Sequence, residues 1–249
     1  MKDVKIVIPA RYNSSRFPGK PLVKILGISL VERVWLQCIK VVGHNNVYVA
    51  TDSNKIITHC KERGMQFIKT YVKCLTGSDR VYEAAKKIKA KIVINVQGDE
   101  PLVSISDIKK IISKAKQNPS QIINAMCKIS SKKDFFSNSV PKVVFNNNND
   151  LLFMSRAPIP YSRKKKILNS FKQVCIYALP FEKLKIFSRQ KKKTRNELNE
   201  DIEILRFLDL GMQVKMIEVS KSSIAVDYPK DISRVEKKIL NLKKMKKKS

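Results

Sequence analysis

Short apolar runs alternate with longer amphipathic segments through the first half of the chain. The apolar runs have the length of β-strands, and between them apolar side chains recur every three or four positions, the spacing of one helix face. Strands are predicted at residues 5–10, 46–51, 66–70 and 91–97. Helices are predicted at residues 29–42, 54–64, 77–89 and 104–118. This alternation favours βαβ units, and therefore an α/β fold with a mixed, mostly parallel sheet flanked by helices.

The pattern changes between about residues 130 and 180, where strand-like segments follow one another. Residues 141–163 favour two strands joined by an Asn-rich turn, because Asn tolerates left-handed backbone, and 171–180 favours a third. The remaining predictions are a helix at 196–211 that ends at Gly211, a strand at 213–219 and a closing helix at 228–244. We therefore expect a single domain over residues 1–249, with a small β-rich subdomain inserted at about 130–180.

Length and composition narrow the class of protein. A chain of 249 residues with 43% hydrophobic content can bury a sizeable core. Its apolar runs are shorter than the roughly 18 residues of a membrane span, and its first residues lack the pattern of a signal peptide. Five scattered cysteines and two histidines do not supply the clustered ligands of a zinc site. These features predict a cytoplasmic protein that does not interact with a membrane.

The net charge of +30 raises the alternative of a basic nucleic-acid-binding protein. However, 40 of the 51 basic residues are lysines, and they are spread along the chain. The densest runs, at 163–166, 189–195 and 243–249, lack the interleaved aromatic residues that stack on bases. Solvated loops and a charged tail are therefore the favoured interpretation. The same charge attracts a small anionic substrate.

The loop after the first strand is a candidate phosphate-binding site. Residues 8–22, IPARYNSSRFPGKPL, place Arg11, Arg16 and Lys20 beyond the carboxyl end of that strand, where α/β sheets bind ligands. Ser14 and Gly19 allow backbone N–H groups to approach phosphate oxygens. The spacing is not that of a Walker A loop, so a basic surface loop remains the alternative.

Two aspartates are candidate metal ligands. Asp99 follows the fourth predicted strand in NVQGDEPL, and Asp227 follows a short apolar run in IAVDYPKDISRV. Two carboxylates suit Mg²⁺, which keeps several waters and also binds substrate phosphates. Taken separately, each residue is also compatible with a structural role, Asp99 in a turn and Asp227 beside a helix N-terminus.

Nine blocks occur in a fixed order along the chain. They are IPARYNSSRFPGKPL, ATD, TGSDR, NVQGDEP, PKVV, MSRAPIP, CIY, EILRFLDLG and VDYPKDISRV. In this order they resemble the signature blocks of the 3-deoxy-manno-octulosonate cytidylyltransferase family, the CMP-Kdo synthetases, from about residue 4 to residue 236. The opening loop and NVQGDEP are the most specific of these blocks.

The resemblance implies a nucleotidyltransferase fold, usually a homodimer with the β-rich segment at the contact between subunits. It implies an Mg²⁺-dependent enzyme that joins CTP to Kdo, releasing CMP-Kdo and pyrophosphate, for lipopolysaccharide biosynthesis. The implied nucleotide-binding residues are Pro9, Ala10, Arg11, Ser14, Lys20, Arg80 and Gln97. Asp99 and Asp227 are the implied metal ligands, and Arg11, Lys20 and Asp99 the implied catalytic residues. The general base stays open, with Asp99 acting through the metal as the simplest candidate.

The acceptor end matches the family less closely than the CTP end. Where the family has His and Gly in its H-x-G-I-Y block, this chain has Gln173 and Cys175, and Ile204 replaces the Gln that follows Glu203. The implied acceptor-binding residues are Arg156, Gln173, Tyr177 and Glu203. Arg156 suits a carboxylate, although a structural ion pair is an equal alternative. Kdo is the first expectation for the acceptor, with 8-amino-Kdo or another ulosonic or sialic-type acid as the alternative.

Overall fold

The structure is a computed structural model that describes residues 4–13, 17–161, 163, 169–220 and 224–246. The elements run in the order β1 (Val4–Pro9), η1 (Lys20–Leu22), β2 (Lys24–Ile25), β3 (Ile28–Ser29), α1 (Leu30–Val42), η2 (His44–Asn46), β4 (Val47–Thr51), α2 (Asn54–Glu62), β5 (Phe67–Lys69), α3 (Gly77–Ile88), β6 (Ile92–Val96), α4 (Ile105–Gln117), β7 (Ile122–Lys128), α5 (Lys132–Phe136), β8 (Lys142–Phe145), β9 (Leu151–Ser155), β10 (Phe171–Pro180), α6 (Phe181–Ser188), α7 (Arg195–Glu200), α8 (Leu205–Asp209), β11 (Val214–Glu218) and α9 (Asp231–Lys246).

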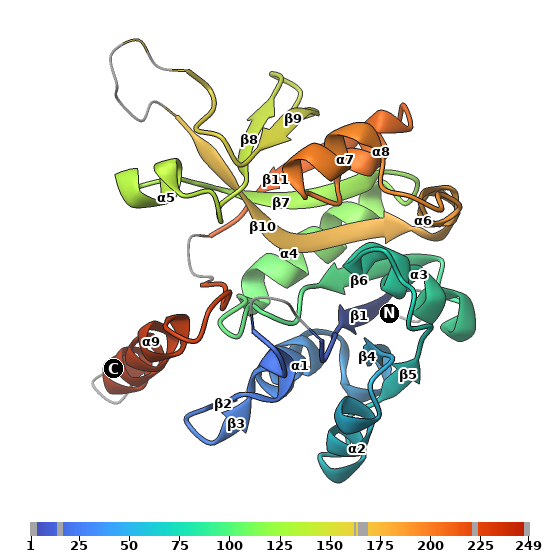
Figure 1. Ribbon diagram of the computed structural model, residues 1–249, viewed down its shortest axis with the longest axis vertical. Coiled ribbons are helices and arrows are strands. Elements are labelled where there is room, and N and C mark those ends of the chain that lie inside the picture. Colours follow the sequence, from blue (N-terminus) through green and yellow to red (C-terminus); the bar gives the residue numbers. More distant parts are fainter. Residues whose placement is uncertain (1–3, 14–16, 162, 164–168, 221–223, 247–249) are drawn as a thin grey trace.

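One nine-stranded sheet runs through the molecule in the order β11-β7-β10-β6-β1-β4-β5, and β8 and β9 join it through β10 (Figure 1). The strands β6, β1, β4 and β5 are parallel to one another, and β11 is parallel to β7. Only β10 interrupts this path, because it is antiparallel to both β6 and β7. The predicted α/β fold with a mixed, mostly parallel sheet is therefore confirmed.

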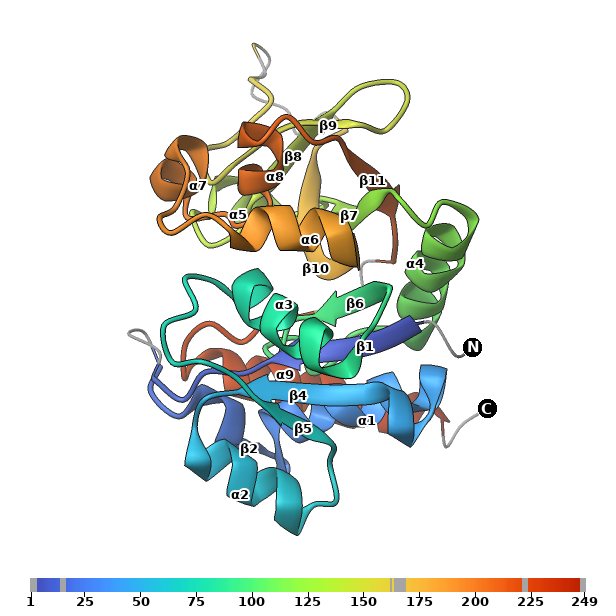
Figure 2. The ribbon, with the colours of Figure 1, turned by 90° about the vertical axis from the view of Figure 1, so that its right-hand side faces the viewer.

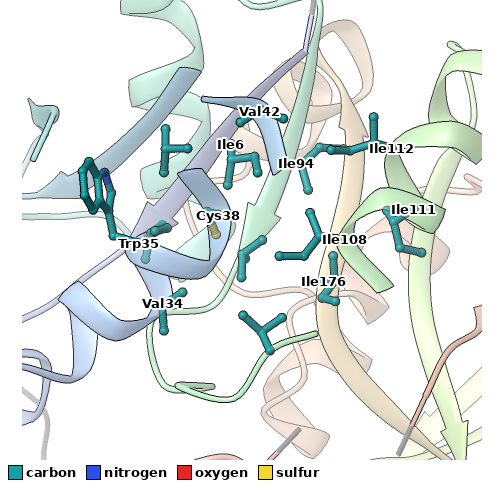
Figure 3. Packing of buried hydrophobic residues seen from close by; sticks show 14 of the residues in the cluster. Ile6, Val34, Trp35, Cys38, Val42, Ile94, Ile108, Ile111, Ile112 and Ile176 are labelled. Atoms are coloured by element: carbon teal, nitrogen blue, oxygen red, sulfur yellow. The ribbon is translucent and has the colours of Figure 1, made fainter. Parts of the chain in front are cut away.

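Helices cover both faces of the sheet, as the two views together show (Figures 1 and 2). On one face, Cys38 of α1, Ile108 of α4 and Ile94 of β6 pack in a single apolar cluster (Figure 3). On the other face, Val93 of β6 packs with residues of α3 and α6. Successive residues of a strand point to opposite faces, so a strand covered on both faces is apolar throughout, as β6 largely is. Among the described residues, no helix has the length and apolar character needed to cross a membrane.

The β-rich segment predicted at about 130–180 is joined to the main sheet. Its first two strands, β8 and β9, form a hairpin whose turn contains Asn149 at φ 60°, and Asn146 Oδ1 accepts from the backbone N–H of Asn148 and Asp150. Its last strand, β10, lies between β6 and β7 in the centre of the sheet. The Asn-rich turn is therefore present as predicted, and the role of this segment in a dimer stays a prediction.

The prediction of a single helix at 196–211 is wrong. The chain forms α7 and α8 instead, separated by Asp201 in the left-handed region at φ 49°. The reason is an ion pair between Arg206 Nη2 and Glu197 Oε1, 2.6 Å apart. In a continuous helix these residues would be about 13–14 Å apart along the axis, at roughly 1.5 Å per residue. The break folds α8 back onto α7, and the two side chains then meet.

Arg206 is the centre of a fully buried ionic network. Its Nε also donates to Glu197 Oε2 at 2.7 Å, and its Nη1 donates to Asp79 Oδ1 at 2.8 Å. The guanidinium stacks 3.9 Å from the ring centre of Phe187 in α6. Asp79 Oδ2 in turn accepts from the backbone N–H and hydroxyl of Thr76, which caps α3. One side chain thus joins α3, α6, α7 and α8.

We expect the substitution Arg206→Leu to lower the free energy of unfolding by about 3–5 kcal/mol, because it leaves Asp79 and Glu197 buried without their cation. Urea unfolding followed by circular dichroism measures the change. The matched control is Lys185→Leu, which removes an exposed pair with Glu182 and should cost less than about 1 kcal/mol. Equal losses of unfolding free energy in the two variants would contradict the proposed contribution of the network to stability.

Candidate active site

A cleft of about 780 Å³ opens at the carboxyl ends of β1 and β6. Because these strands are parallel and adjacent, the loops that follow them meet at one edge of the sheet. Its walls come from the opening loop, the start of α3, the segment after β6, the first half of β10 and the junction between α7 and α8. The lining includes the following residues predicted for the site: Pro9, Ala10, Arg11, Lys20, Arg80, Gln97, Asp99, Arg156, Gln173, Tyr177, Glu203 and Asp227. Ser14 and Arg16 lie outside the described residues.

Lys20 connects three segments at the part of the cleft lined by the opening loop. Its Nζ lies 3.0 Å from Asp99 Oδ2 and donates to the carbonyl oxygen of Val226 at 3.0 Å. The turn before it contains Gly19 at φ 71°, a left-handed conformation that favours glycine. Gly98 is also required by space, because a Cβ there would lie 3.1 Å from the carbonyl oxygen of Pro9. The opening loop and the segment after β6 are therefore in close contact.

The two candidate metal ligands lie on neighbouring segments. The backbone N–H of Val226, next to Asp227, donates to the carbonyl oxygen of Asp99 at 2.9 Å. Asp231 at the start of α9 accepts from the backbone N–H of Asp227, which holds this segment in place. Across the part of the chain that the structure describes, no three His, Cys, Asp or Glu side chains converge on a metal position. Carboxylates are the ligand type that Mg²⁺ combines with water and substrate oxygens, and the assignment of Asp99 and Asp227 to a metal stays a prediction.

Two parts of the cleft, one lined by the opening loop and one lined by β10, meet at Gln97 and Glu203. Gln97 Nε2 donates to Glu203 Oε1 at 2.9 Å, and Glu203 Oε2 accepts from the backbone N–H of Ser78 at 3.0 Å. A Cβ at Gly77 would lie 3.0 Å from Gln97 Nε2, so the start of α3 comes close to this pair. Burial raises the pKa of the Glu203 carboxyl, and the Ser78 N–H opposes this shift.

Arg80 is buried in the cleft wall formed by the start of α3. Its Nη1 lies 3.0 Å from Asp52 Oδ1 and also donates to the hydroxyl of Thr70. Its Nε is buried and has no hydrogen-bond partner within the described residues. Asp52 belongs to the ATD block, so the structure brings that block and TGSDR together.

The second part of the cleft is lined by residues of β10. Gln173 Nε2 donates to Asn124 Oδ1 at 3.0 Å and to the hydroxyl of Tyr177 at 3.3 Å. The backbone N–H of Cys175 donates to Glu100 Oε1 at 3.2 Å, at an irregularity in the pairing of β10 with β7. Burial raises the pKa of the Cys175 thiol and of the Tyr177 hydroxyl well above their usual values. Cys175 is therefore a neutral thiol near neutral pH and not a nucleophilic thiolate.

Arg156 is anchored by carbonyl oxygens. Its Nε donates to Glu200 at 2.7 Å, its Nη1 to Asn138 at 3.0 Å and its Nη2 to Asp201 at 2.9 Å. A guanidinium has five N–H donors, so these bonds leave two for another acceptor. Both readings of Arg156, a structural anchor and a carboxylate ligand, are compatible with this geometry.

Lys142 was not predicted from the sequence. It is fully buried, and its Nζ donates to the carbonyl oxygens of Ser137 at 2.9 Å, Val140 at 2.7 Å and Arg156. Burial lowers the pKa of its ammonium from 10.5 to about 8. Its position in PKVVF carries no signal of burial, because lysine is among the residue types least often buried.

The family model described as cytidylyltransferase matches residues 5–221. The chain belongs to the cytidylyltransferase family. This cytidylyltransferase is 34% identical to the 3-deoxy-manno-octulosonate cytidylyltransferase of Escherichia coli over 235 residues, which are 94% of the chain and 95% of the relative. It is 33% identical over 242 residues to the 8-amino-3,8-dideoxy-manno-octulosonate cytidylyltransferase of Shewanella baltica, covering 95% and 98% of the two chains. The resemblance seen in the sequence blocks is therefore confirmed.

Solved structures agree with this assignment. A CMP:2-keto-3-deoxy-manno-octonic acid synthetase complexed with CTP superimposes with a TM-score of 0.87 at 33% identity, covering 96% of this chain and 98% of the other. A glucose-1-phosphate thymidylyltransferase from Bacillus anthracis superimposes with a TM-score of 0.68 at 12% identity, over 94% of each chain. The second likeness shows the fold alone, and it confirms the nucleotidyltransferase architecture.

The lowered pKa of Lys142 predicts a specific dependence of stability on pH. Between about pH 8 and pH 10.5 the unfolded chain keeps a proton that the folded chain has released, so this group makes the free energy of unfolding rise with pH. The free energy of unfolding of the wild type should therefore rise relative to that of Lys142→Met over this range, by at most about 1.4 kcal/mol per pH unit. Urea unfolding at several pH values measures it. The control is Lys110→Met, an exposed lysine that also donates to a carbonyl oxygen, and a parallel trend there would contradict the prediction.

Proposed function

We propose that this cytidylyltransferase transfers the cytidylyl group of CTP to the anomeric hydroxyl of Kdo, giving CMP-Kdo and pyrophosphate. The observation that carries the proposal is one cleft in which a basic phosphate end and a polar acceptor end meet at the Gln97–Glu203 hydrogen bond of 2.9 Å. The CTP-bound relative, similar over 96% of this chain, supports the nucleotide. The Escherichia coli relative supports the acceptor.

The proposed reaction is an in-line displacement. The anomeric oxygen forms a bond to the α-phosphorus of CTP, and the bond from that phosphorus to the β-phosphate oxygen breaks. Arg11 and Lys20 bind the triphosphate and stabilise the charge that develops on the α-phosphate and on the leaving pyrophosphate. Arg80 and Gln97 face the cytosine end. Catalysis then depends on position and charge, and the neutral Cys175 takes no covalent part.

We further propose that Asp99 and Asp227 hold Mg²⁺. When bound, the ion would neutralise charge on the phosphate oxygens of CTP and of the leaving pyrophosphate. The carboxylate of Asp99 also contacts Lys20, at 3.0 Å, and so orients this ammonium toward the phosphate end. The segment of Asp227 is held by two hydrogen bonds, from the Val226 N–H to the carbonyl oxygen of Asp99 and from the Asp227 N–H to the carboxylate of Asp231.

At the acceptor end, Gln173, Tyr177 and Glu203 are proposed to bind hydroxyl groups of the sugar, and Arg156 its carboxylate. The Gln173 amide already donates to Asn124 and Tyr177, which fixes the direction of its carbonyl oxygen. The alternative acceptor is the 8-amino sugar acid. The relative from Shewanella baltica, named for that acceptor and 33% identical to this chain, supports this alternative.

Pyrophosphate release tests the function directly. Purified protein with CTP and Mg²⁺ is assayed against Kdo, 8-amino-Kdo and N-acetylneuraminic acid, with Asp99→Ala as the blank. We expect release with Kdo, and a loss of at least about 100-fold in the blank, because Asp99 acts on both the metal and Lys20. Release only with the 8-amino acid would move the function to that acceptor. Release with none of the acids, while CTP still binds, would refute the proposed reaction.

Activity as a function of Mg²⁺ concentration tests the proposed ligands. We expect chelation with EDTA to abolish turnover and added Mg²⁺ to restore it. Asp227→Asn should raise the Mg²⁺ concentration needed for half-maximal activity by about tenfold or more, since it replaces an ionised ligand. Asp150→Asn, in the turn between β8 and β9 and paired with Lys215, is the control. An unchanged Mg²⁺ requirement in Asp227→Asn would remove this residue from the metal site.

A further inference from the structure

Lys142 is a buried cation that the proposed reaction does not use. Its ammonium is bonded to the carbonyl oxygens of Ser137, Val140 and Arg156, and these three residues all line the cleft. Lys142 lies at the start of β8, where it pairs with Ser155 of β9 and Lys172 of β10. It therefore stands directly behind the wall at the acceptor end.

The contacts of Lys142 continue into the wall itself. Lys142 holds the carbonyl group of Arg156, and the Arg156 guanidinium holds the carbonyl groups of Asn138, Glu200 and Asp201. Three separate segments are joined in this way: the 137–140 loop, the end of β9 and the junction between α7 and α8. That junction leads directly to Glu203, so the same contacts set the position of Arg156 relative to Glu203.

The charge of the Lys142 ammonium is stabilised by the dipoles of carbonyl groups and not by a hydrogen-bonded carboxylate. A buried cation is costly unless it is compensated, and three carbonyl oxygens supply hydrogen bonds without cancelling its charge. Glu200, the acidic residue whose charge acts on it, is bonded to the hydroxyl of Ser155 at 2.6 Å and to the backbone N–H of Arg156 at 2.8 Å. Lys142 and Arg156 thus place two cations close together at this wall, with Glu200 between them and the α7–α8 junction.

We propose that Lys142 is a positioning residue for the acceptor carboxylate: it fixes Arg156 and the 137–140 loop, and it adds positive charge behind them. The proposal rests on the proposed function, because it assumes that the acceptor is an acid. A fixed donor pair backed by an uncancelled cation favours a carboxylate over a neutral group at this position.

The proposal separates the two substrates. Lys142 acts on the acceptor end, while the phosphate end is held by the contacts of Lys20 with Asp99 and Val226. Its loss should therefore raise the KM for the acid and leave the KM for CTP nearly unchanged. A general loosening of the fold would affect both substrates.

The experiment uses Lys142→Gln, which keeps hydrogen-bond donors but loses the charge, and Lys142→Met, which loses both. Steady-state pyrophosphate release gives both KM values, and CTP titration calorimetry shows that each variant is folded. The expected increase in the KM for the acid is about 10- to 100-fold in Lys142→Met, the range for a lost charge-assisted contact, with the KM for CTP within about twofold. Lys215→Met, which removes a lysine of β11 paired with Asp150 in the turn between β8 and β9, is the matched control.

A second readout isolates the charge. The methyl ester of the accepted sugar acid lacks the carboxylate, and its inhibition constant should be nearly the same in Lys142→Gln and in the wild type. An equal loss for the acid and its ester would overturn the proposal, and so would an unchanged KM for the acid in an active, folded variant. If the wild-type protein turns over none of the acids, the proposed function fails and this inference fails with it.

Discussion

The buried ion pairs of Arg206 with Glu197 and Asp79 are the interactions on which the arrangement of α3, α7 and α8 beside the cleft depends. The Arg206 guanidinium compensates Glu197 and Asp79, two carboxylates that the fold removes from water. A buried charge of this kind tolerates little displacement, because each unmatched charge carries a large desolvation cost. The helices that carry these residues are therefore held in one arrangement.

The arrangement of these helices also sets the positions of residues in the cleft. Asp79 caps α3 through Thr76, and the next residue, Gly77, comes close to the Gln97 amide. The break between α7 and α8 that brings Arg206 to Glu197 also brings Glu203 to Gln97 and to the backbone of Ser78. The hydrogen bond between Gln97 and Glu203 therefore depends on the ionic network.

The two ends of the cleft are built in different ways. The phosphate end uses a single loop, a strand end and two aspartates, joined by Lys20 and by the backbone contact between Val226 and Asp99. The acceptor end is assembled from β10, the β8–β9 hairpin and the α7–α8 junction, and its positive charge includes the buried Lys142. Gln173 and Cys175, which depart from the family blocks, lie at this second end. Their hydrogen-bond partners there are the side chains of Asn124, Tyr177 and Glu100. Differences in acceptor among relatives are therefore expected to arise there.

The sequence by itself determined the strand and helix alternation, the turns of the opening loop and the placing of Asp99 after the fourth predicted strand. These features depend on periodicity and turn chemistry, which are properties of neighbouring residues. The ordered blocks added the family, and the structure gathered the described residues of its site into one cleft. Only the tertiary structure decided that the predicted helix at 196–211 is broken at Asp201, that β10 lies in the centre of the sheet, and that Lys142 is buried. Gln97 and Glu203 are 106 residues apart in the chain, and the contact between them follows from pairing and burial that no local pattern contains.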